Sequence, residues 1–206
     1  MPEDRVYIVD DDAQFRDGLQ FLFMTNQMLS QVFPDGEQFT SKLEDLEPGC
    51  VLLDVRMPNM DGISTLRQMQ PYLGKFAVIV MTGHGDVSTA VEAMKLGATD
   101  FVEKPFLEEK LVEMVRETQA GVRKAHAEDE NRRVAEEKIA KLTPREKEVL
   151  LHLMGGSSNK VAAQRMGVSP RTVEMHRSRM TDRLGVTSLS EAVRISVLAG
   201  LAPAEG

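Results

Sequence analysis

The sequence predicts an α/β domain with a doubly wound five-stranded parallel sheet, followed by a small all-α domain of four helices. Over roughly the first 120 residues, short β-rich apolar runs alternate with segments of helical periodicity. This alternation is typical of a parallel sheet with right-handed crossovers and helices on both faces. Further along, the charge balance reverses. Residues 1–140 carry 15 Lys and Arg against 26 Asp and Glu, whereas residues 141–206 carry 10 against 6.

Five apolar runs are predicted as strands because each is short, β-rich and closed by polar or turn-forming residues. The third run ends in Asp54, and Pro58 and Gly62 close the loop that follows it. Asp54 therefore lies at the carboxyl end of a strand, where open α/β sheets place their chemistry. The predicted strands are residues 6–9, 29–33, 50–55, 77–81 and 101–103.

The segments between these strands have the apolar spacing of helices. Asn26 is expected to end the first helix in a left-handed conformation, and Gly97 to end the fourth. The predicted helices are residues 13–26, 37–46, 63–69 and 87–96, with a fifth starting near residue 107.

The composition excludes several classes of protein. No apolar run reaches the roughly 18 residues of a membrane span, and the N-terminus has no signal-peptide layout, so we expect a cytoplasmic protein without a membrane partner. Cys50 is the single cysteine, expected to be a small buried hydrophobe, and no zinc-ligand spacing is present. No Walker or dinucleotide motif follows a strand, which argues against nucleotide binding.

The second half of the chain is predicted to be helical throughout. Residues 123–141 are rich in Ala, Glu, Lys and Arg, and we interpret them as a solvated helical linker, too weak in apolar heptads to favour a coiled coil. Thr143, Pro144 and Glu146 form a strong helix start. The expected domains are residues 1–122 and 142–206. The helices of the second are 144–154, 159–166 and 170–184, with a fourth that starts near residue 188 or 190 and ends before residue 200.

Polar side chains follow four of the predicted strands. Asp10 and Asp11 follow the first strand and Asp54 the third, and these strands are neighbours in the sheet order 2-1-3-4-5. Three converging carboxylates repel one another, and a divalent cation relieves the repulsion. A site with few protein ligands and room for water molecules suits Mg²⁺. Such a cation can neutralise a phosphoryl group that is transferred to a carboxylate nucleophile.

Thr82 after the fourth strand offers a hydroxyl donor, and Lys104 after the fifth offers a cation suited to a phosphate oxygen. The plainer interpretations are that one of the acids, most simply Asp12, caps the first helix, and that Asp54 is a turn residue. The combination at four strand ends favours the phosphoryl site.

The first 120 or so residues resemble a two-component receiver domain. The resemblance implies that Asp10 and Asp11 bind the metal with Asp54 and the Arg56 backbone carbonyl. It further implies that Asp54 is the phosphoacceptor, Thr82 the switch hydroxyl and Lys104 the lysine before a cis-proline. Phe101 matches the aromatic that turns inward on activation. His84, two residues past Thr82, is either a residue that tunes phosphoryl lifetime or loop filler.

The predicted helix 170–184 has the pattern of a reading helix. Val173, Met180 and Leu184 share one side, and a short helix and a Gly turn precede it, as in a helix-turn-helix. The outward face would meet base edges, and the flanking cations would meet phosphates. The candidate DNA-contacting residues are Asn159, Lys160, Arg171, Thr172, Glu174, Met175, Arg177, Ser178 and Arg179.

Residues 141–203 resemble a LuxR/NarL-type DNA-binding domain, and the whole chain is similar to the FixJ-type response regulators. This resemblance implies a sensor histidine kinase as phosphodonor and promoter DNA and RNA polymerase as partners. It also implies a homodimer formed on phosphorylation through residues 87–103. Relief of an interdomain block is an alternative means of control.

Two rival functions are open at this point. A Mg²⁺-dependent phosphatase or phosphotransferase for small molecules would share the aspartyl chemistry, although the sequence has no insertion to build a substrate pocket. A protein-interaction adaptor would need no DNA, and its C-terminal domain would not lose affinity for DNA steeply with salt.

Overall fold

The computed structural model describes residues 5–83 and 87–204, apart from the side chain of Val87. The chain divides into two compact units, Met1–His126 and Ala127–Gly206. Within the described residues, no helix is both long enough and apolar enough to cross a membrane. His84, discussed above, lies outside the described residues.

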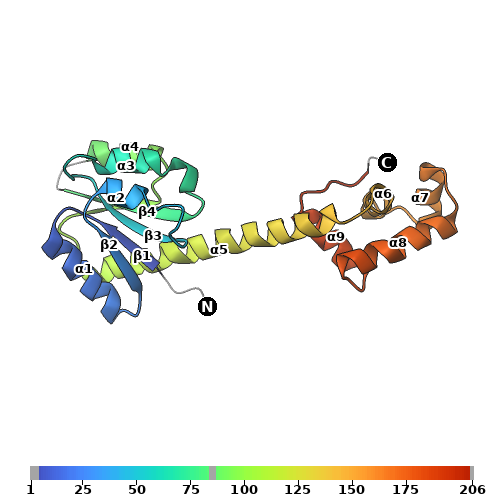
Figure 1. Cartoon of the computed structure of the whole chain (residues 1–206), viewed down its shortest axis with the longest axis horizontal. Coiled ribbons are helices and arrows are strands. Elements are labelled where there is room, and N and C mark those ends of the chain that lie inside the picture. The colour runs from blue at the N-terminus through green and yellow to red at the C-terminus, as the bar shows by residue number, and fades with distance from the viewer. Residues whose placement is uncertain (1–4, 84–86, 205–206) are drawn as a thin grey trace. The chain divides into compact units, whose positions relative to one another are not determined.

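The first unit contains a five-stranded sheet in the order β2-β1-β3-β4-β5, in which all pairs are parallel (Figure 1). This is the predicted doubly wound order, and it places the ends of β1 and β3 side by side: Val9 pairs with Leu53. The strands are β1 (Arg5–Val9), β2 (Leu29–Phe33), β3 (Gly49–Asp54), β4 (Phe76–Thr82) and β5 (Asp100–Glu103).

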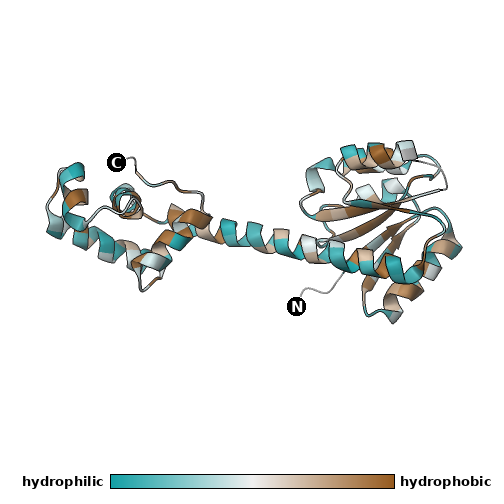
Figure 2. Cartoon of the chain, turned by 180° about the vertical axis from the view of Figure 1, so that it is seen from behind, coloured by the Kyte–Doolittle hydropathy of each residue, from teal (hydrophilic) through white to brown (hydrophobic). Residues whose placement is uncertain are grey.

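Alternate strand residues feed two separate hydrophobic cores. Tyr7 and Val51 pack on the side of α2, α3 and α4, whereas Ile8 and Leu52 pack on the side of α1 and α5. This period of two is what a strand with both faces covered requires. The strands are accordingly apolar almost throughout (Figure 2). Cys50 is fully buried in the second of these cores, as expected, and burial raises the pKa of its thiol.

Helices cover both faces of the sheet (Figure 1). Most follow the predicted bounds within a residue or two, but the expected helix over residues 37–46 is wrong beyond Thr40. There the carbonyls of Leu43 and Glu44 accept hydrogen bonds from Lys75 Nζ at 3.0 Å, and turns replace the helix. The helices are α1 (Ala13–Thr25), α2 (Gly36–Thr40), α3 (Gly62–Gln68) with the short 3₁₀ turn η1 (Gln70–Tyr72), and α4 (Val87–Lys95).

The end of α1 differs from the expectation by one residue. Asn26 has φ −92°, so it is not the left-handed residue, and Gln27 takes that conformation with φ 61°. The Asn26 amide instead donates to the carbonyl of Leu22 at 2.9 Å. This side-chain bond stabilises the end of the helix and moves the left-handed turn to the next residue.

Helix α5 (Glu108–Ala140) contributes residues to both units. Leu111 and Val115 are buried in the first unit, and Ala135 and Ile139 are buried in the second. Residues 123–141 are therefore not solvated along their whole length, which corrects the linker prediction at its C-terminal end. The middle of the helix is hydrophilic (Figure 2).

The second unit is completed by four helices with capped starts. The predicted starts at Thr143 and Ser169 are confirmed as N-caps, and Gly167 makes the tight turn with φ 66°. Two small cores hold the unit together, one around Leu150, Met180 and Ile195 and one around Val149 and Val173. The helices are α6 (Pro144–Met154), α7 (Asn159–Met166), α8 (Pro170–Leu184) and α9 (Leu189–Leu198).

Candidate functional site

Three of the predicted residues meet at the carboxyl edge of the sheet. Asp10 follows β1, Asp54 is the last residue of β3, and Lys104 follows β5. The Lys104 ammonium donates to Asp10 Oδ2 at 2.7 Å and to Asp54 Oδ1 at 2.6 Å. Both carboxylates are buried, with 1% and 7% of their surface exposed. Charge-assisted bonds of this kind fix the two acids side by side.

The other oxygen of each carboxylate is also held by the main chain. Asp10 Oδ1 accepts from the amide of Asp12 at 2.9 Å, and Asp54 Oδ2 accepts from the amide of Arg56 at 2.7 Å. Burial raises the pKa of Asp10, against the opposing influence of Lys104. Burial also acts to lower the pKa of Lys104, but its hydrogen bonds to the two acids outweigh burial and leave that pKa above its ordinary value.

The remaining acids at this edge have different roles. Asp12 accepts from the amides of Gln14 and Phe15, so it is the N-cap of α1, as the plainer interpretation held. Asp11 is exposed. Among the described residues, no three His, Cys, Asp or Glu side chains lie close enough together to hold a metal ion. Each carboxylate oxygen of Asp10 and Asp54 accepts one of the hydrogen bonds given above and has a second lone pair, and carboxylate oxygens suit Mg²⁺.

Thr82 and Phe101 lie on β4 and β5, the two strands on one side of β3. Thr82 is the last residue of β4 and is buried, and the amide of Lys104 donates to its carbonyl at 2.7 Å. Phe101 is on β5 with 45% of its surface exposed, so its ring lies outward. The Lys104-Pro105 peptide bond is cis, as the resemblance implied.

Gly62 lets the chain return close beneath Asp54. Its amide donates to the carbonyl of Val55 at 2.9 Å. A Cβ on this residue would meet the backbone carbonyl of Asp54 and would lie 2.8 Å from the Cα of Val55. Gly62 is thus required by this close approach. The preceding Asp61 caps α3, and the hydrogen bonds that its carboxylate accepts from Ser64 lower the pKa of Asp61.

Two residues of this site were not singled out from the sequence. The ring of Phe15 lies under the Lys104 ammonium, 4.0 Å from Nζ to the ring centroid. Arg16 Nη1 donates to the carbonyl of Asp10 at 2.5 Å. In the sequence, Phe15 is simply one of the apolar residues of the predicted helix over residues 13–26. The signal that was available is its place three residues after the capping Asp12, beside the acidic pair.

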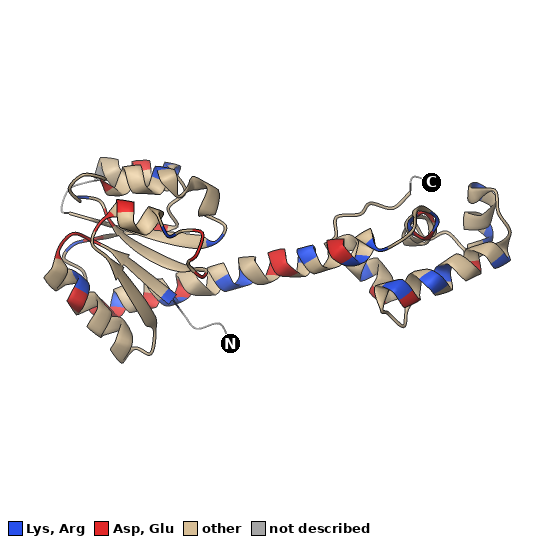
Figure 3. Cartoon of the chain, in the orientation of Figure 1, with Lys and Arg blue, Asp and Glu red and all other residues tan. Residues whose placement is uncertain are grey.

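The second unit exposes the predicted DNA-contacting face of α8. Val173, Met180 and Leu184 are buried, as expected. On the other side Arg171, Glu174 and Met175 are exposed, together with Ser178 and Arg179, while Thr172 and Arg177 are half-buried. Lys160 is exposed and Asn159 half-buried at the start of α7. Lys and Arg recur along α8 (Figure 3).

Comparisons with known proteins agree with both halves of this arrangement. The family described as "Response regulator receiver domain" matches residues 6–116, and the family "Bacterial regulatory proteins, luxR family" matches residues 140–196. The transcriptional regulatory protein FixJ of Bradyrhizobium diazoefficiens is 42% identical over 199 residues, which cover 95% of this chain and 96% of that protein. FixJ of Azorhizobium caulinodans is 40% identical, covering 100% and 98%.

This chain is a FixJ-type response regulator. Among solved structures, full-length FixJ from B. japonicum has 41% identity and a TM-score of 0.59, covering 97% of this chain and 98% of that chain. The response regulator StyR has 31% identity and a TM-score of 0.85, covering 95% and 98%. The receiver fold and the helical DNA-binding domain predicted from the sequence are thereby confirmed.

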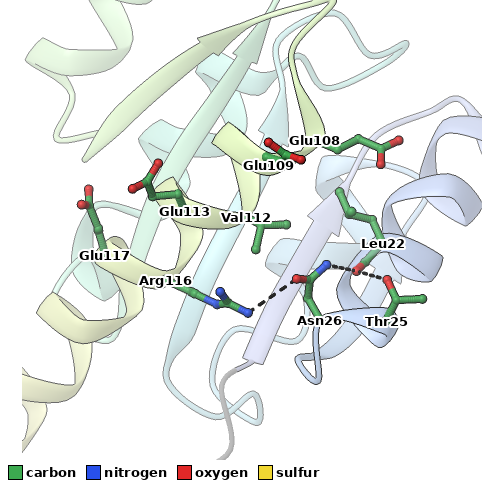
Figure 4. A pocket seen from close by; sticks show the side chains of 9 residues that line it. All are labelled: Leu22, Thr25, Asn26, Glu108, Glu109, Val112, Glu113, Arg116 and Glu117. Carbon is green, nitrogen blue, oxygen red and sulfur yellow. Dashed lines mark hydrogen bonds between the residues drawn. The ribbon is translucent and has the colours of Figure 1, made fainter.

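Among the described residues, three hollows open on the surface of the receiver. A groove of about 750 Å³ lies between α1 and α5, lined by Leu22 and Val112 and by a row of glutamates (Figure 4). A smaller apolar hollow of about 360 Å³ lies against Phe101. Neither is lined by Asp54. A third hollow, of about 570 Å³, adjoins the Asp54 edge, because Val55, Arg56 and Asp61 line it.

A buried carboxylate stabilises the start of the DNA-binding unit. Glu146 has 2% of its side chain exposed, accepts from the amide of Thr143 at 2.9 Å and pairs with Arg183 at 3.1 Å. Burial alone would raise the pKa of Glu146, but the hydrogen bonds from Thr143 and the charges of Arg183 and His176 outweigh it and lower the pKa.

We expect Thr143→Ala to lower the free energy of unfolding of the second unit by about 1 kcal/mol, the usual cost of a lost N-cap.

Because the Glu146 pKa is lowered in the folded state, the charge of Glu146 stabilises the fold above the ordinary glutamate pKa, and this stability is lost as the pH falls through the folded-state pKa. Glu146→Gln, which keeps a capping partner, should therefore be less stable than wild type at pH 7, with the difference shrinking at acid pH. Calorimetry of the full chain against pH measures both effects, and a difference that grows on acidification would contradict them.

Proposed function

We propose that this response regulator is switched by phosphorylation of Asp54 and that the switch controls its binding to promoter DNA. The observation that carries the proposal is the buried Asp54 carboxylate, held by Lys104 at 2.6 Å and by the amide of Arg56 at 2.7 Å. Asp54 is the last residue of β3, so its carboxylate lies at the carboxyl edge of the sheet. The proposed phosphodonor is a sensor histidine kinase or acetyl phosphate.

In the transfer, an oxygen of Asp54 forms a bond to phosphorus while the bond from phosphorus to the donor breaks, and the donor leaves with that electron pair. Lys104 then donates to a phosphoryl oxygen in place of the carboxylate oxygen that it binds now. The Thr82 hydroxyl donates to a second phosphoryl oxygen. Thr82 ends the neighbouring strand β4, and Lys104, which follows β5, already reaches Asp54 Oδ1, so neither side chain has to cross the sheet edge.

Mg²⁺ is proposed to bind through Asp10, Asp11, Asp54 and the Arg56 carbonyl, and when bound it neutralises charge on the phosphoryl group. The donor set is made of hard oxygens, which fits this ion. Asp11 is exposed beside the buried pair, and this leaves a carboxylate available at the solvent side.

Replacing Asp11 and Asp12 by Asn one at a time should distinguish a metal ligand from a helix cap. Asp11→Asn is expected to weaken Mg²⁺ binding by about tenfold to a hundredfold or more, since the loss of even an outer-shell partner of a metal site costs that much. Asp12→Asn is the matched control, because Asn caps helices as well as Asp and α1 stays capped. Titration of each full-length variant with Mg²⁺ measures the affinities. Equal losses in both variants, or a loss in Asp12→Asn alone, would contradict the assignment.

Phosphorylation is proposed to act through the face that runs from residue 87 to Glu103. This face carries exposed apolar side chains, Val91, Met94 and Phe101, which line one shallow hollow. Inward rotation of Phe101 would reshape that hollow and allow a second copy to pack against it. A dimer presents two reading helices to one DNA and multiplies affinity through effective concentration.

The test is to measure the mass of the full-length chain in solution and its binding to genomic DNA fragments, with and without acetyl phosphate and Mg²⁺. We expect the phosphodonor to produce a dimer and to enrich a common sequence among the bound fragments. Enrichment with no change in mass would replace dimerisation by relief of an interdomain block. Turnover of the phosphodonor without any effect on DNA would favour the phosphotransferase.

A further inference from the structure

The ammonium of Lys104 has an aromatic neighbour as well as two carboxylates. Its Nζ lies 4.0 Å from the centroid of the Phe15 ring. A cation within about 6 Å of a ring centroid is attracted by the negative face of the ring, more strongly where water is excluded. Only 25% of the Lys104 side chain is exposed, so this contact is partly shielded from water.

The Phe15 ring is held from both sides of the site. On one side, the backbone amide of Phe15 donates to the carboxylate of Asp12 at 3.2 Å, and the backbone amide of Asp12 donates to Asp10 Oδ1 at 2.9 Å. On the other side Phe106, two residues after Lys104, packs edge-on against the ring, with centroids 5.9 Å apart and planes at 66°. The ring position is therefore tied both to the acid pair and to the segment that carries Lys104.

We propose that Phe15 is a positioning residue for Lys104, whose ammonium it keeps at Asp54 while the phosphoryl group is transferred. The proposal rests on the function proposed above. During transfer Lys104 exchanges a carboxylate oxygen of Asp54 for a phosphoryl oxygen. Hydrogen bonds to the carboxylates depend on direction and are broken or bent by this movement, whereas attraction to a ring face depends weakly on direction. The ring therefore stabilises the ammonium throughout the exchange.

Replacing Phe15 with Leu removes the ring face but keeps an apolar side chain against the core. We expect the maximal rate of phosphorylation by acetyl phosphate to fall by roughly threefold to tenfold, within the range of a single cation–π contact. Affinity for Mg²⁺ should not change, since the proposed ligands remain. Phe15→Trp restores a ring face and should recover most of the rate.

The matched control is Phe23→Leu. Phe23 lies on the same helix and is fully buried in the core against which Phe15 packs, so this substitution perturbs the same packing without touching the Lys104 ring contact. We expect Phe23→Leu to lower stability but to leave the maximal rate of phosphorylation of the folded chain unchanged.

A spectroscopic readout separates positioning from packing. In the full chain labelled with ¹⁵N-lysine, ammonium protons above a ring face are shielded by the ring current, and the Lys104 signal is assigned by its loss in Lys104→Arg. We expect that shielding in wild type, in Phe15→Trp and in Phe23→Leu, and its loss in Phe15→Leu. The measurement needs no phosphodonor.

Equal rates in wild type and Phe15→Leu, or equal slowing in the Leu and Trp variants, would overturn the positioning role. An unshielded Lys104 signal in wild type would overturn it as well. If the wild-type chain takes up no phosphoryl group, the proposed function fails, and the ammonium signal still decides whether Lys104 lies over the ring.

Discussion

Asp54→Asn is expected to abolish phosphorylation of the chain and every response to a phosphodonor. The amide keeps the size of the carboxylate, so the variant should fold. The amide is neutral and has no anionic oxygen, so it is a poor nucleophile for phosphorus and a weaker partner for Lys104, which donates to Asp54 Oδ1 at 2.6 Å. Neither dimer formation nor DNA binding should then change on addition of acetyl phosphate and Mg²⁺. Phosphate-affinity electrophoresis and sedimentation measure the two responses.

Asp35→Asn provides the matched control for this substitution. Asp35 follows β2 as Asp54 ends β3, and it caps α2 by accepting from the amide of Gln38 at 2.7 Å. Asn serves equally well as a cap, so the same chemical change here should leave phosphorylation intact. Full phosphodonor-dependent dimerisation of Asp54→Asn would exclude the proposed switch.

The double variant Arg177→Ala and Arg179→Ala is expected to lose most DNA affinity at low salt, about tenfold to a hundredfold. Both cations lie on the flanks of α8, where phosphate contacts are expected. Each phosphate contact releases counterions, so the slope of log affinity against log salt should become shallower by about 2 when two contacts are lost. Because such contacts carry no sequence information, random DNA should lose affinity along with the selected site.

Arg133→Ala controls for the loss of positive charge. Arg133 belongs to the same unit but lies on α5, where it pairs with Glu130 at 2.7 Å and Glu137 at 2.5 Å. We expect the salt slope of Arg133→Ala to match that of wild type. A double variant whose slope equals the wild-type slope would mean that the outward side of α8 does not meet phosphate.

The sequence was sufficient for the elements whose signals are local. Helices α7 and α8 begin and end at the predicted residues because their caps, Ser158, Ser169 and the left-handed Gly167 and Gly185, are all encoded within the helix or next to it. Helix α2 was predicted too long: the amides of Lys42 and Leu43 bond only three residues back, and Lys75, more than thirty residues away, binds the carbonyls at the end of the turns that follow. Periodicity carries no information about such a contact.

The candidate site was predictable to the same extent. Residues at strand ends converge whenever strand order is known, so Asp10, Asp54 and Lys104 were found together. The orientation of side chains is a different matter. That Asp11 is exposed, and that the Phe15 ring lies under an ammonium, depends on the helix entry set by Asp12 and on packing with Phe106. These contacts join distant segments and leave no mark in local spacing.

Because α5 buries Ala135 and Ile139 among the α8 and α9 side chains, the DNA-binding unit does not begin where its own first capped helix begins. A gene fusion or a protease cut at Leu142 would remove two side chains from that interior and leave voids in their place. Any exchange of sensory modules between regulators of this kind therefore has to keep the last two turns of the preceding helix with the DNA-binding half. The N-terminal boundary of the DNA-binding domain therefore lies inside α5, upstream of the loop between α5 and α6.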